Sequence, residues 1–209
     1  FGATAVLCTA TQPVLGDLIQ RFAPSHTVSE ICPQIPFYFD KFRRVTFRQV
    51  GVLEDDALAE LLCAHEQVLC IVNSRKAAQS IFSKLPEEGS FHLSTLMVPA
   101  HRRTVLEEIR RRLNDGLPCR VVSTSLVEAG VDIDFPAVYR ELAGLDSILQ
   151  AAGRCNREGK RAAEDSIVTI FRRTEKAPPL FGQAIGATNI ALDNNADPAS
   201  PQKSEAKRS

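Results

Sequence analysis

Residues 121–134 have the sequence VVSTSLVEAGVDID, in which an apolar run ends in hydroxyl side chains and leads to a glycine and two aspartates. The run at residues 120–124 is typical of a strand that is covered on both faces of a sheet. A second segment, QAAGRCNR at residues 150–157, places two arginines three positions apart after a glycine. Together the two segments favour a domain that binds nucleic acid at one edge and a triphosphate at another.

Strands and helices alternate on both sides of this stretch. Further short strands are predicted at residues 4–9, 45–50, 68–72, 91–95, 131–133, 137–140 and 166–171. Apolar residues at helical spacing predict helices at residues 55–66, 75–85, 101–113 and 145–156. Strands that alternate with helices of this length indicate an α/β domain with a mostly parallel sheet.

For two of these helices the sequence predicts the capping residue or the buried face. The helix at 75–85 follows Ser74, whose hydroxyl is suited to accept a hydrogen bond from a backbone N–H group of the first turn. The predicted buried face of the helix at 55–66 consists of Ala57, Leu58, Leu61 and Leu62.

The chain divides into four predicted segments. Residues 1–22 hold a strand and a helix that begins near Pro13, and we expect them to end a preceding domain, since a chain that starts at Phe1 resembles a piece of a longer protein. Residues 23–44 contain three prolines and are expected to form a connector. Residues 45–175 form the α/β domain. Residues 176–209 begin with a weak helix at about 180–192 and end in a polar tail, which we expect to be a flexible linker.

Composition limits the classes of partner. The chain has 25 basic and 25 acidic side chains, so any nucleic-acid contact must come from a local patch. No apolar run has the length of a membrane span, and we expect no membrane partner. The six cysteines form no C-x-x-C pair, which argues against zinc and disulfides and favours reduced thiols in a cytoplasmic protein without a metal site of its own.

Polar residues follow several predicted strands at the point where each strand ends. In open α/β sheets, ligands bind beyond the carboxyl ends of the strands. A single Ser-Thr pair after a strand is most often a helix cap, but several such groups together favour a ligand edge. The groups are Thr11, Asn73-Ser74-Arg75, Ser94-Thr95, Ser123-Thr124 and Asp132.

Arg154 and Arg157 are expected on one helix, where positions three apart point the same way and can converge on one anion. The guanidinium group presents a planar fork of donors that matches phosphate oxygens. A solvated helix end would also carry arginines, but it does not explain the small residues at 151–153. A second basic cluster, between His101 and Arg112, is interrupted by two glutamates and is interpreted mainly as a solvated helix face, with a phosphate contact from Arg102 or Arg103 as the alternative.

Several segments resemble the motifs of superfamily 2 helicases in their order. They are Thr9-Ala10-Thr11, Asn73-Ser74-Arg75, residues 121–134 and residues 150–157, in the places of motifs III, IV, V and VI. The sequences LVEAGVDIDFP and YRELAGLDSILQAAGRCNREG are similar to the helicase part of the CRISPR-associated nuclease-helicase of type I systems. The resemblance covers residues 1–172, and residues 180–192 resemble the start of that family's linker helix. It implies a RecA-like three-layer fold, with the end of the first RecA-like domain at 1–22 and the second domain at 45–175.

The resemblance also implies residue roles. Arg154 and Arg157 would contact the γ-phosphate of ATP, with Arg157 as an arginine finger, and Gln150 would sense the nucleotide from the same helix. Asp132 would approach the ribose or a water near the phosphates. Gly130 would allow a close approach of the backbone in the nucleotide site. Thr9 and Thr11 would couple the nucleotide site to the DNA site. Contacts to the backbone of single-stranded DNA would come from Ser74, Arg75, Thr95 and Thr124.

Some expected motifs do not occur. The sequence has no G-x-x-x-x-G-K-[ST] loop, no D-E-x-H box and no His-Asp pair. The resemblance therefore implies that ATP and Mg²⁺ are held mainly by a first RecA-like domain, that a nuclease metal belongs to another domain, and that this segment alone is inactive. In the complete ATP-dependent hydrolase, the implied partners are single-stranded DNA and the CRISPR RNA-guided surveillance complex.

Three alternatives remain open. The chain could belong to another superfamily 2 motor, such as a restriction translocase or an RNA helicase. In isolation it could act as a non-catalytic module that binds nucleic acid or protein. A Rossmann-like transferase is disfavoured because no glycine-rich turn follows the first strand.

Overall fold

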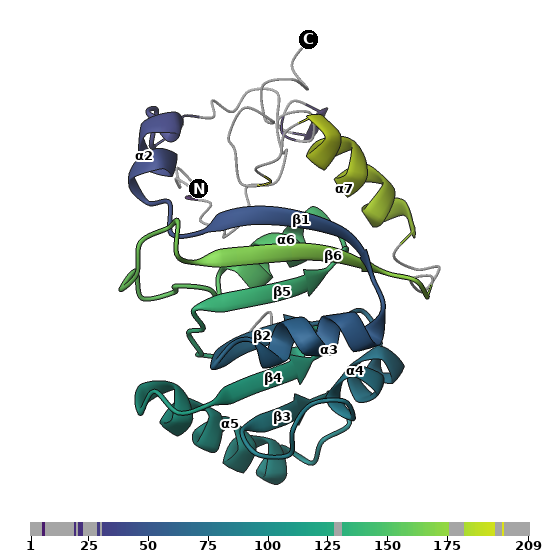
Figure 1. Ribbon diagram of the computed structural model, residues 1–209. Helices are drawn as coiled ribbons and strands as arrows, with labels where there is room; N and C mark the ends of the chain where they lie inside the picture. Colours follow the sequence, from purple (N-terminus) through teal and green to yellow (C-terminus); the bar gives the residue numbers. More distant parts are fainter. Residues whose placement is uncertain are drawn as a thin grey trace. The chain divides into compact units, whose positions relative to one another are not determined.

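The computed structural model describes residues 31–127, 131–175 and 182–194, together with positions 6, 19, 21–22, 29 and 198. The chain forms two units, residues 1–42 with 200–209 and residues 43–199, and we describe each by itself. The larger unit contains a six-stranded sheet with helices on both faces (Figure 1). The predicted three-layer α/β fold is confirmed.

All neighbouring strands of the sheet run parallel. The strands are β1 (Thr46–Leu53), β2 (Gln67–Ile71), β3 (Ser90–Leu93), β4 (Cys119–Ser123), β5 (Ala137–Glu141) and β6 (Ile167–Arg173). Their order across the sheet is β1-β6-β5-β2-β4-β3. Because the strands are parallel, all their carboxyl ends lie at one edge, the carboxyl edge, and all their amino ends lie at the opposite edge, the amino edge.

Helices α3 (Asp55–Cys63) and α4 (Arg75–Phe82) cover one face of the sheet, and α5 (Pro99–Asn114) and α6 (Leu145–Ala152) cover the other (Figure 1). Successive side chains of a strand point to opposite faces, so β2 supplies both layers of the core. Val68 and Cys70 belong to the cluster that α3 and α4 complete, whereas Leu69 and Ile71 belong to the cluster of α5 and α6.

The buried face of α3 differs from the prediction. Leu58, Ala59 and Leu62 are buried, whereas Ala57 and Leu61 are exposed. Positions 58, 59 and 62 form one narrow stripe at 100° per residue, and only one stripe of a helix that lies on a sheet can face it. The apolar side chain of Leu61 on the outer face is ordinary for a soluble domain.

Helix α6 ends earlier than predicted. Gly153 is its C-cap, so the predicted extension of the helix to residue 156 is wrong. Cys155 instead forms an isolated parallel bridge with Phe135, and Asn156 has a φ of 47°, which lies in the left-handed region and is incompatible with a continuing helix.

Two further predictions need correction. Residues 131–133 form no strand, because Phe135 makes only an isolated bridge and the following Pro136 has no N–H group to donate to a ladder. The connector at 23–44 contains a short helix, α2 (Ile35–Lys41), with a proline in its first turn, where the missing donor has no cost.

The predicted helix at about 180–192 is confirmed as α7 (Gly182–Asn194). Leu192 and Ile185 of α7 pack in a cluster with Ile148 of α6. The predicted strand at 4–9, most of the helix near Pro13 and the polar tail lie outside the described residues. The predicted domain boundaries stay predictions.

Candidate functional site

Polar residues follow β2, β3 and β4 at the carboxyl edge, as predicted. Ser74 is the N-cap of α4, and its Oγ accepts a hydrogen bond from the N–H of Ala77 at 3.1 Å. The side chains of Arg75 and Thr95 are exposed. The hydroxyl of Ser74 is therefore used by its own helix, whereas Arg75 and Thr95 face solvent at this edge.

Thr124 is the most enclosed of the four residues that are predicted to contact DNA, which are Ser74, Arg75, Thr95 and Thr124. It is only 8% exposed, and its N–H donates to the carbonyl of Leu93 at 3.4 Å. Its Oγ1 has no hydrogen-bond partner in the described part of the chain. A buried hydroxyl without a partner costs free energy, so this group is suited to donate to an oxygen of a bound phosphate.

A buried polar network lies beside this edge, between β2 and β5. Arg140 Nη1 donates to Asn73 Oδ1 and to the carbonyl of Glu141, both at 2.7 Å. The N–H of Asn73 donates to the Glu141 carboxylate at 2.7 Å, and its side chain donates to the carbonyl of Leu142 at 2.8 Å. Asn73 is thus held through both backbone and side chain, which fixes the direction of the chain into Ser74.

Burial dominates the electrostatics of this network. It raises the pKa of Glu141, while the Asn73 N–H group, Arg173 and Arg140 act in the opposite direction. Sequence reasoning missed Arg140 and Glu141. Their signal was present, because two adjacent opposite charges interrupt the otherwise apolar strand AVYRE.

The two arginines of the QAAGRCNR segment lie outside α6. They occupy the turn after Gly153, so the predicted convergence from one helix face is wrong in its geometry. Phe135, which bridges Cys155, directly precedes β5, and residues 158–166 lead into β6. Arg154 and Arg157 therefore lie at the amino edge, together with the segment that enters β5.

Arg157 pairs with Asp132 in this structure. Its Nε lies 2.9 Å from Asp132 Oδ1, and its side chain is 44% exposed. The N–H of Arg157 donates to Asp134 Oδ1 at 2.7 Å, and Arg161 lies 3.5 Å from the other oxygen of Asp134. Asp132 and Asp134 thus hold the side chain and the backbone of Arg157, respectively.

Asp132 was predicted at the carboxyl edge, and this placement is wrong. Residues 124–134 begin at the end of β4 and run to the start of β5, so the segment crosses from the carboxyl edge to the amino edge. The Nε of Arg110, on α5, donates to the carbonyl of Asp132 at 3.0 Å and holds the far end of this segment.

Arg154 is buried, and its Nε donates to the carbonyl of Val127 at 2.8 Å. Burial is the main cause that lowers the pKa of Arg154; the nearby charge of Arg157 adds to this, and Asp132 opposes it. Arg154 therefore ties the crossing segment 124–134 to the turn that carries Arg157.

Asn156 fixes the same turn to the start of the sheet. Its side chain is buried and donates to the carbonyls of Arg44 and Arg161 at 2.8 and 2.7 Å, and its Oδ1 accepts from the N–H of Arg161 at 3.0 Å. Sequence reasoning quoted Asn156 but gave it no role. The signal was its residue type, since asparagine tolerates the left-handed conformation better than most residues.

Gln150 is exposed in the last turn of α6, two residues before Ala152. Gly130, Thr9 and Thr11 lie outside the described residues, so their predicted roles stay predictions.

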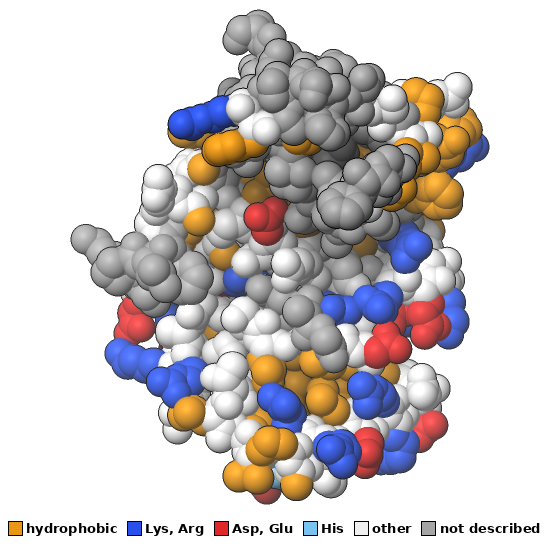
Figure 2. Space-filling view, turned by 180° about the vertical axis from the view of Figure 1, so that it is seen from behind, with side chains coloured by type: hydrophobic (Ala, Val, Ile, Leu, Met, Phe, Trp, Pro, Cys, Tyr) orange, Lys and Arg blue, Asp and Glu red, His pale blue; other side chains and the backbone are white. Residues whose placement is uncertain are grey.

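The basic residues of α5 fall into two groups. Arg111 and Arg112 pair with Glu108 at 2.7 and 2.9 Å, and Arg111 also pairs with Asp115 at 3.1 Å. This half of the helix is a solvated face with internal ion pairs, as the main interpretation predicted. Figure 2 shows several Lys and Arg side chains beside hydrophobic ones at the end of the domain that α5 covers.

The described residues fit one side of a nucleotide site. The exposed guanidinium of Arg157 and the exposed carboxylate of Asp132 can meet a phosphate and a ribose hydroxyl, but no glycine-rich phosphate loop accompanies them in the sequence. In the described part of the chain, no group of three or more His, Cys, Asp or Glu side chains is placed to hold a metal ion. No described helix is both long and apolar enough to cross a bilayer.

Comparisons with known proteins agree with these features. Residues 64–160 match the family described as CRISPR-associated nuclease/helicase Cas3, C-terminal. The CRISPR-associated nuclease/helicase Cas3 of Haloferax volcanii is 37% identical over 83 residues, which are 38% of this chain and 9% of that protein. The chain thus spans about a tenth of the length of this relative.

Two solved structures share the fold. The structure of T. fusca Cas3-ADP has a TM-score of 0.57 at 18% identity, over 77% of this chain and 23% of that one. The structure titled CRISPR RNA-guided surveillance complex, pre-nicking, contains a chain with a TM-score of 0.56 at 19% identity, over 74% of this chain and 23% of that one. The RecA-like fold is confirmed, and so is the resemblance to the helicase C-terminal domain that residues 121–157 predicted.

Proposed function

We propose that this chain is the second RecA-like part of an ATP-dependent helicase and nuclease that acts on DNA in CRISPR interference, because residues 64–160 match the family described as CRISPR-associated nuclease/helicase Cas3, C-terminal. One observation carries the proposal. Arg154 and Arg157 lie at the amino edge on a turn held by Asp132, Asp134 and Asn156, away from the polar residues at the carboxyl edge. One domain thus offers a cation site and a separate strand-binding edge.

We infer that Arg157 exchanges its partner during turnover. In the structure its guanidinium is paired with the exposed carboxylate of Asp132, and both groups reach solvent. An exposed ion pair of this kind is weak, so a phosphate group from a neighbouring domain can displace Asp132 at little cost. The planar fork of Arg157 then donates to phosphate oxygens where negative charge develops.

Arg154 has a different role in this proposal. Because it is buried and bound to the carbonyl of Val127, it positions the crossing segment as well as adding positive charge near the phosphates. Gln150 and Asp132 supply exposed polar atoms near the nucleotide, and Gly130 a close backbone approach.

The carboxyl edge binds the backbone of single-stranded DNA in this proposal. Thr124 donates its buried hydroxyl to one phosphate, and Arg75 and Thr95 contact others from exposed positions. Ser74, as the N-cap, places the first turn of α4 at this edge. Contacts of this type hold a strand without selecting its sequence.

The crossing segment 124–134 couples the two edges. Thr124 lies at its start and Asp132 near its end, and Arg154 binds the carbonyl of Val127 between them. A shift of Arg157 and Asp132 toward a nucleotide therefore moves the backbone segment that also carries Thr124. Thr9 and Thr11 would take part in this coupling from the preceding domain.

Bound ATP with Mg²⁺ supplies the free energy for movement through hydrolysis of its terminal phosphate, and both would be held mainly by the first RecA-like domain. A divalent metal would serve a nuclease domain elsewhere in the complete protein. This segment alone would be inactive, because it contributes only half of each site. The complete protein would act in the cytoplasm with the RNA-guided surveillance complex as its partner, in line with the fold it shares with a chain of such a complex.

The direct test uses the full-length protein with matched single-stranded DNA, duplex DNA and single-stranded RNA. We expect ATP hydrolysis to be stimulated by single-stranded DNA and strand displacement to require ATP. Stimulation by duplex DNA alone would support a restriction-type translocase, and stimulation by RNA alone would support an RNA helicase. Strand binding without ATP hydrolysis would leave only a binding module.

A further inference from the structure

The turn after β3 presents two apolar side chains to solvent. Leu96 is 73% exposed and Val98 is 66% exposed, although Met97 between them is partly buried against the core cluster of α5 and α6. The turn is fixed by a hydrogen bond from the N–H of Met97 to the carbonyl of Ser94 at 3.2 Å. Met97 therefore anchors the turn while Leu96 and Val98 project outward in a defined arrangement.

This turn lies at the carboxyl edge, beside the residues proposed to bind a strand. Thr95 is part of it, and the hydrogen bond from the Thr124 N–H to the Leu93 carbonyl joins the ends of β4 and β3. A phosphate held by Thr124 or Thr95 would place its nucleotide next to Leu96 and Val98.

The charges of α5 support the same position. Arg103 is exposed and Arg102 is half-buried in the first turns of α5, and no hydrogen bond or ion pair joins their side chains to other described side chains. Arg111 and Arg112, in the last turns, are instead neutralised by Glu108. Cations at a helix amino end are unfavourable with respect to the helix dipole, so an external anion at this place would relieve them.

We propose that Leu96 and Val98 contact the bases of the single-stranded DNA whose phosphates are held by Thr95, Thr124 and the arginines of the first turns of α5. The inference rests on the proposed strand binding at the carboxyl edge and names the part of the ligand that meets this turn. Single-stranded DNA fits because it is a polyanion with unstacked apolar base faces, and this surface pairs unneutralised cations with exposed apolar side chains. An apolar contact to base faces is tolerant of sequence, as a translocating motor requires.

The test compares the double variant Leu96→Ser/Val98→Ser with the wild type in the full-length protein. Val98 is the N-cap of α5, and serine is a preferred N-cap, so the variant keeps the helix stable. We expect its affinity for single-stranded DNA to fall about tenfold through lost apolar contact. On a strand of equal length made of abasic nucleotides, which keeps the phosphates, wild type and variant should bind equally. ATP hydrolysis without DNA should be unchanged.

Salt dependence separates this contact from the charged ones. The serine variant should keep the wild-type slope of log affinity against log salt, because it removes no phosphate contact. Arg103→Ala should reduce that slope by about 0.7 if it loses one phosphate of a single strand. The matched control is Val52→Ser on β1, which is 60% exposed at the opposite side of the sheet and should leave DNA affinity unchanged.

Three results would overturn the inference. They are an equal loss of affinity on abasic and normal strands, a loss below about twofold on normal strands, and a loss in Val52→Ser as large as in the double variant. Reduced binding of the surveillance complex with unchanged DNA affinity would assign the turn to a protein partner and would also overturn it. Failure of the proposed strand binding looks different, since the wild type would then not bind single-stranded DNA.

Discussion

The carboxyl edge and the amino edge of the same sheet are built in different ways. At the carboxyl edge, each polar group directly follows its own strand, and short-range contacts such as the Ser74 cap hold it. At the amino edge, the turn around Arg157 is held by two distant pieces of chain, the segment with Asp132 and Asp134 and the carbonyl of Arg44. The proposed strand-binding edge is thus local in sequence, whereas the arginine turn depends on contacts between segments that are distant in sequence.

This difference has an energetic side. The contacts around Arg157 are partly exposed ion pairs, which contribute little stability and exchange readily. In the network beside the carboxyl edge, Arg140 and Glu141 are buried, Asn73 is half-buried, and hydrogen bonds of 2.7 Å join them, so the network is costly to break. The structure therefore combines a stiff carboxyl edge with a more easily displaced cation at the amino edge.

The largest expected effect separates the two edges directly. Arg157→Ala in the complete protein should lower DNA-stimulated ATP hydrolysis by about 10³-fold or more, because a cation that stabilises transition-state charge is lost. DNA affinity, measured on the same preparation, should stay within about twofold of the wild type, because the carboxyl edge is intact. Lys160→Ala, a nearby exposed cation paired with Glu158, is the control and should be active. A loss of less than about tenfold in the rate would remove the finger role from Arg157.

The next effect tests the stiffness of the carboxyl edge. Arg140→Met removes a buried cation that donates to Asn73 Oδ1 and to the Glu141 carbonyl and that lowers the pKa of the buried Glu141, so it should destabilise the domain by about 3 kcal/mol. Hydrogen exchange of the backbone amides of β2 and β5 in the complete protein would measure this loss. Arg120→Met is the control, since Arg120 is only half-buried and the hydrogen bond from its guanidinium to the Cys63 carbonyl is long at 3.4 Å. Equal protection in both variants would show that the network is not what holds the edge.

A smaller effect concerns the link between the edges. Thr124→Ala should weaken single-strand binding by about fivefold, since one hydrogen bond to a charged phosphate oxygen is lost. It should also increase the ATP consumed per base pair unwound, because residue 124 no longer binds the strand when the crossing segment moves. Thr124→Ser keeps the hydroxyl and should restore both properties. Unchanged unwinding efficiency in Thr124→Ala would exclude this residue from coupling.

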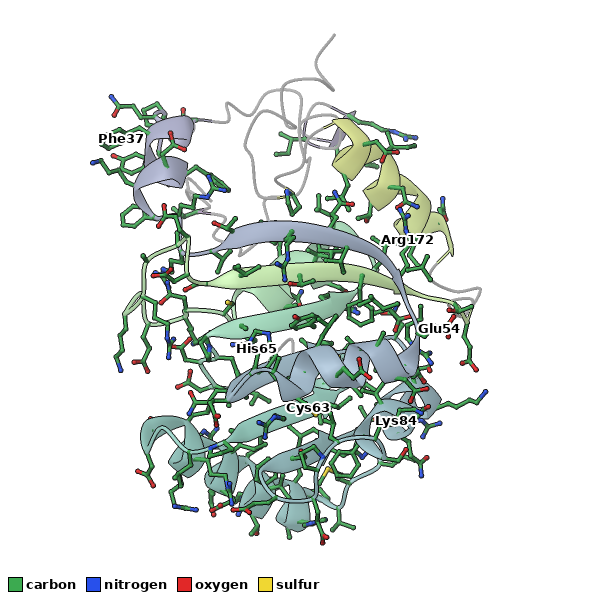
Figure 3. The ribbon with its side chains drawn as sticks, viewed as in Figure 1. Phe37, Glu54, Cys63, His65, Lys84 and Arg172 are labelled. Atoms are coloured by element: carbon green, nitrogen blue, oxygen red, sulfur yellow. The ribbon has the colours of Figure 1, made fainter. Side chains whose placement is uncertain are left out.

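The smallest expected effect concerns the pH dependence of the stability of the sheet itself, against which changes at the two edges can be compared. The Nε2 of His65, which follows α3, lies 3.2 Å from the Oη of Tyr139 on β5 (Figure 3). Burial lowers the pKa of His65 below 6.5, and the positive charges of Arg48 and Arg120 lower it further. The unfolded chain therefore binds the proton more readily, and the free energy of unfolding should fall as pH drops through 6.5 and below.

His65→Gln keeps a polar contact to Tyr139 and removes the titration. Denaturant titrations at pH values above and below 6.5 should give a smaller stability difference for this variant than for the wild type. An identical pH dependence in both proteins would assign the effect to other groups.

The sequence predicted the carboxyl edge better than the amino edge, for a physical reason. A strand that ends in polar residues before a capped helix is a local pattern, so Ser74, Thr95 and Thr124 lie where they were expected. The end of α6 is not local, because the left-handed Asn156 is stabilised by the distant carbonyl of Arg44 and not by its neighbours alone. Asp132 was misplaced for the same reason, since no short-range pattern shows that residues 124–134 cross the sheet.

The core was predicted in outline but not in detail. The alternation of strands and helices fixed the three layers, because period 2 and period 3.6 are properties of each segment alone. The buried stripe of α3 depends on how the helix rotates on the sheet, and only packing of Leu58 and Leu62 against the strands decides this. Arg140 and Glu141 were missed because burial of a charged pair is decided by the strands on either side of β5.

The left-handed Asn156 has a consequence for how two domains meet. Its three side-chain hydrogen bonds hold the arginine turn in one shape before any neighbour arrives. The entropy of ordering that backbone is lost when the chain folds and not when the domains close, so closure needs to immobilise little more than the side chain of Arg157. In the proposed function, such preorganisation would let a small gain in contact energy, on the scale of a single nucleotide, change the distance between two domains.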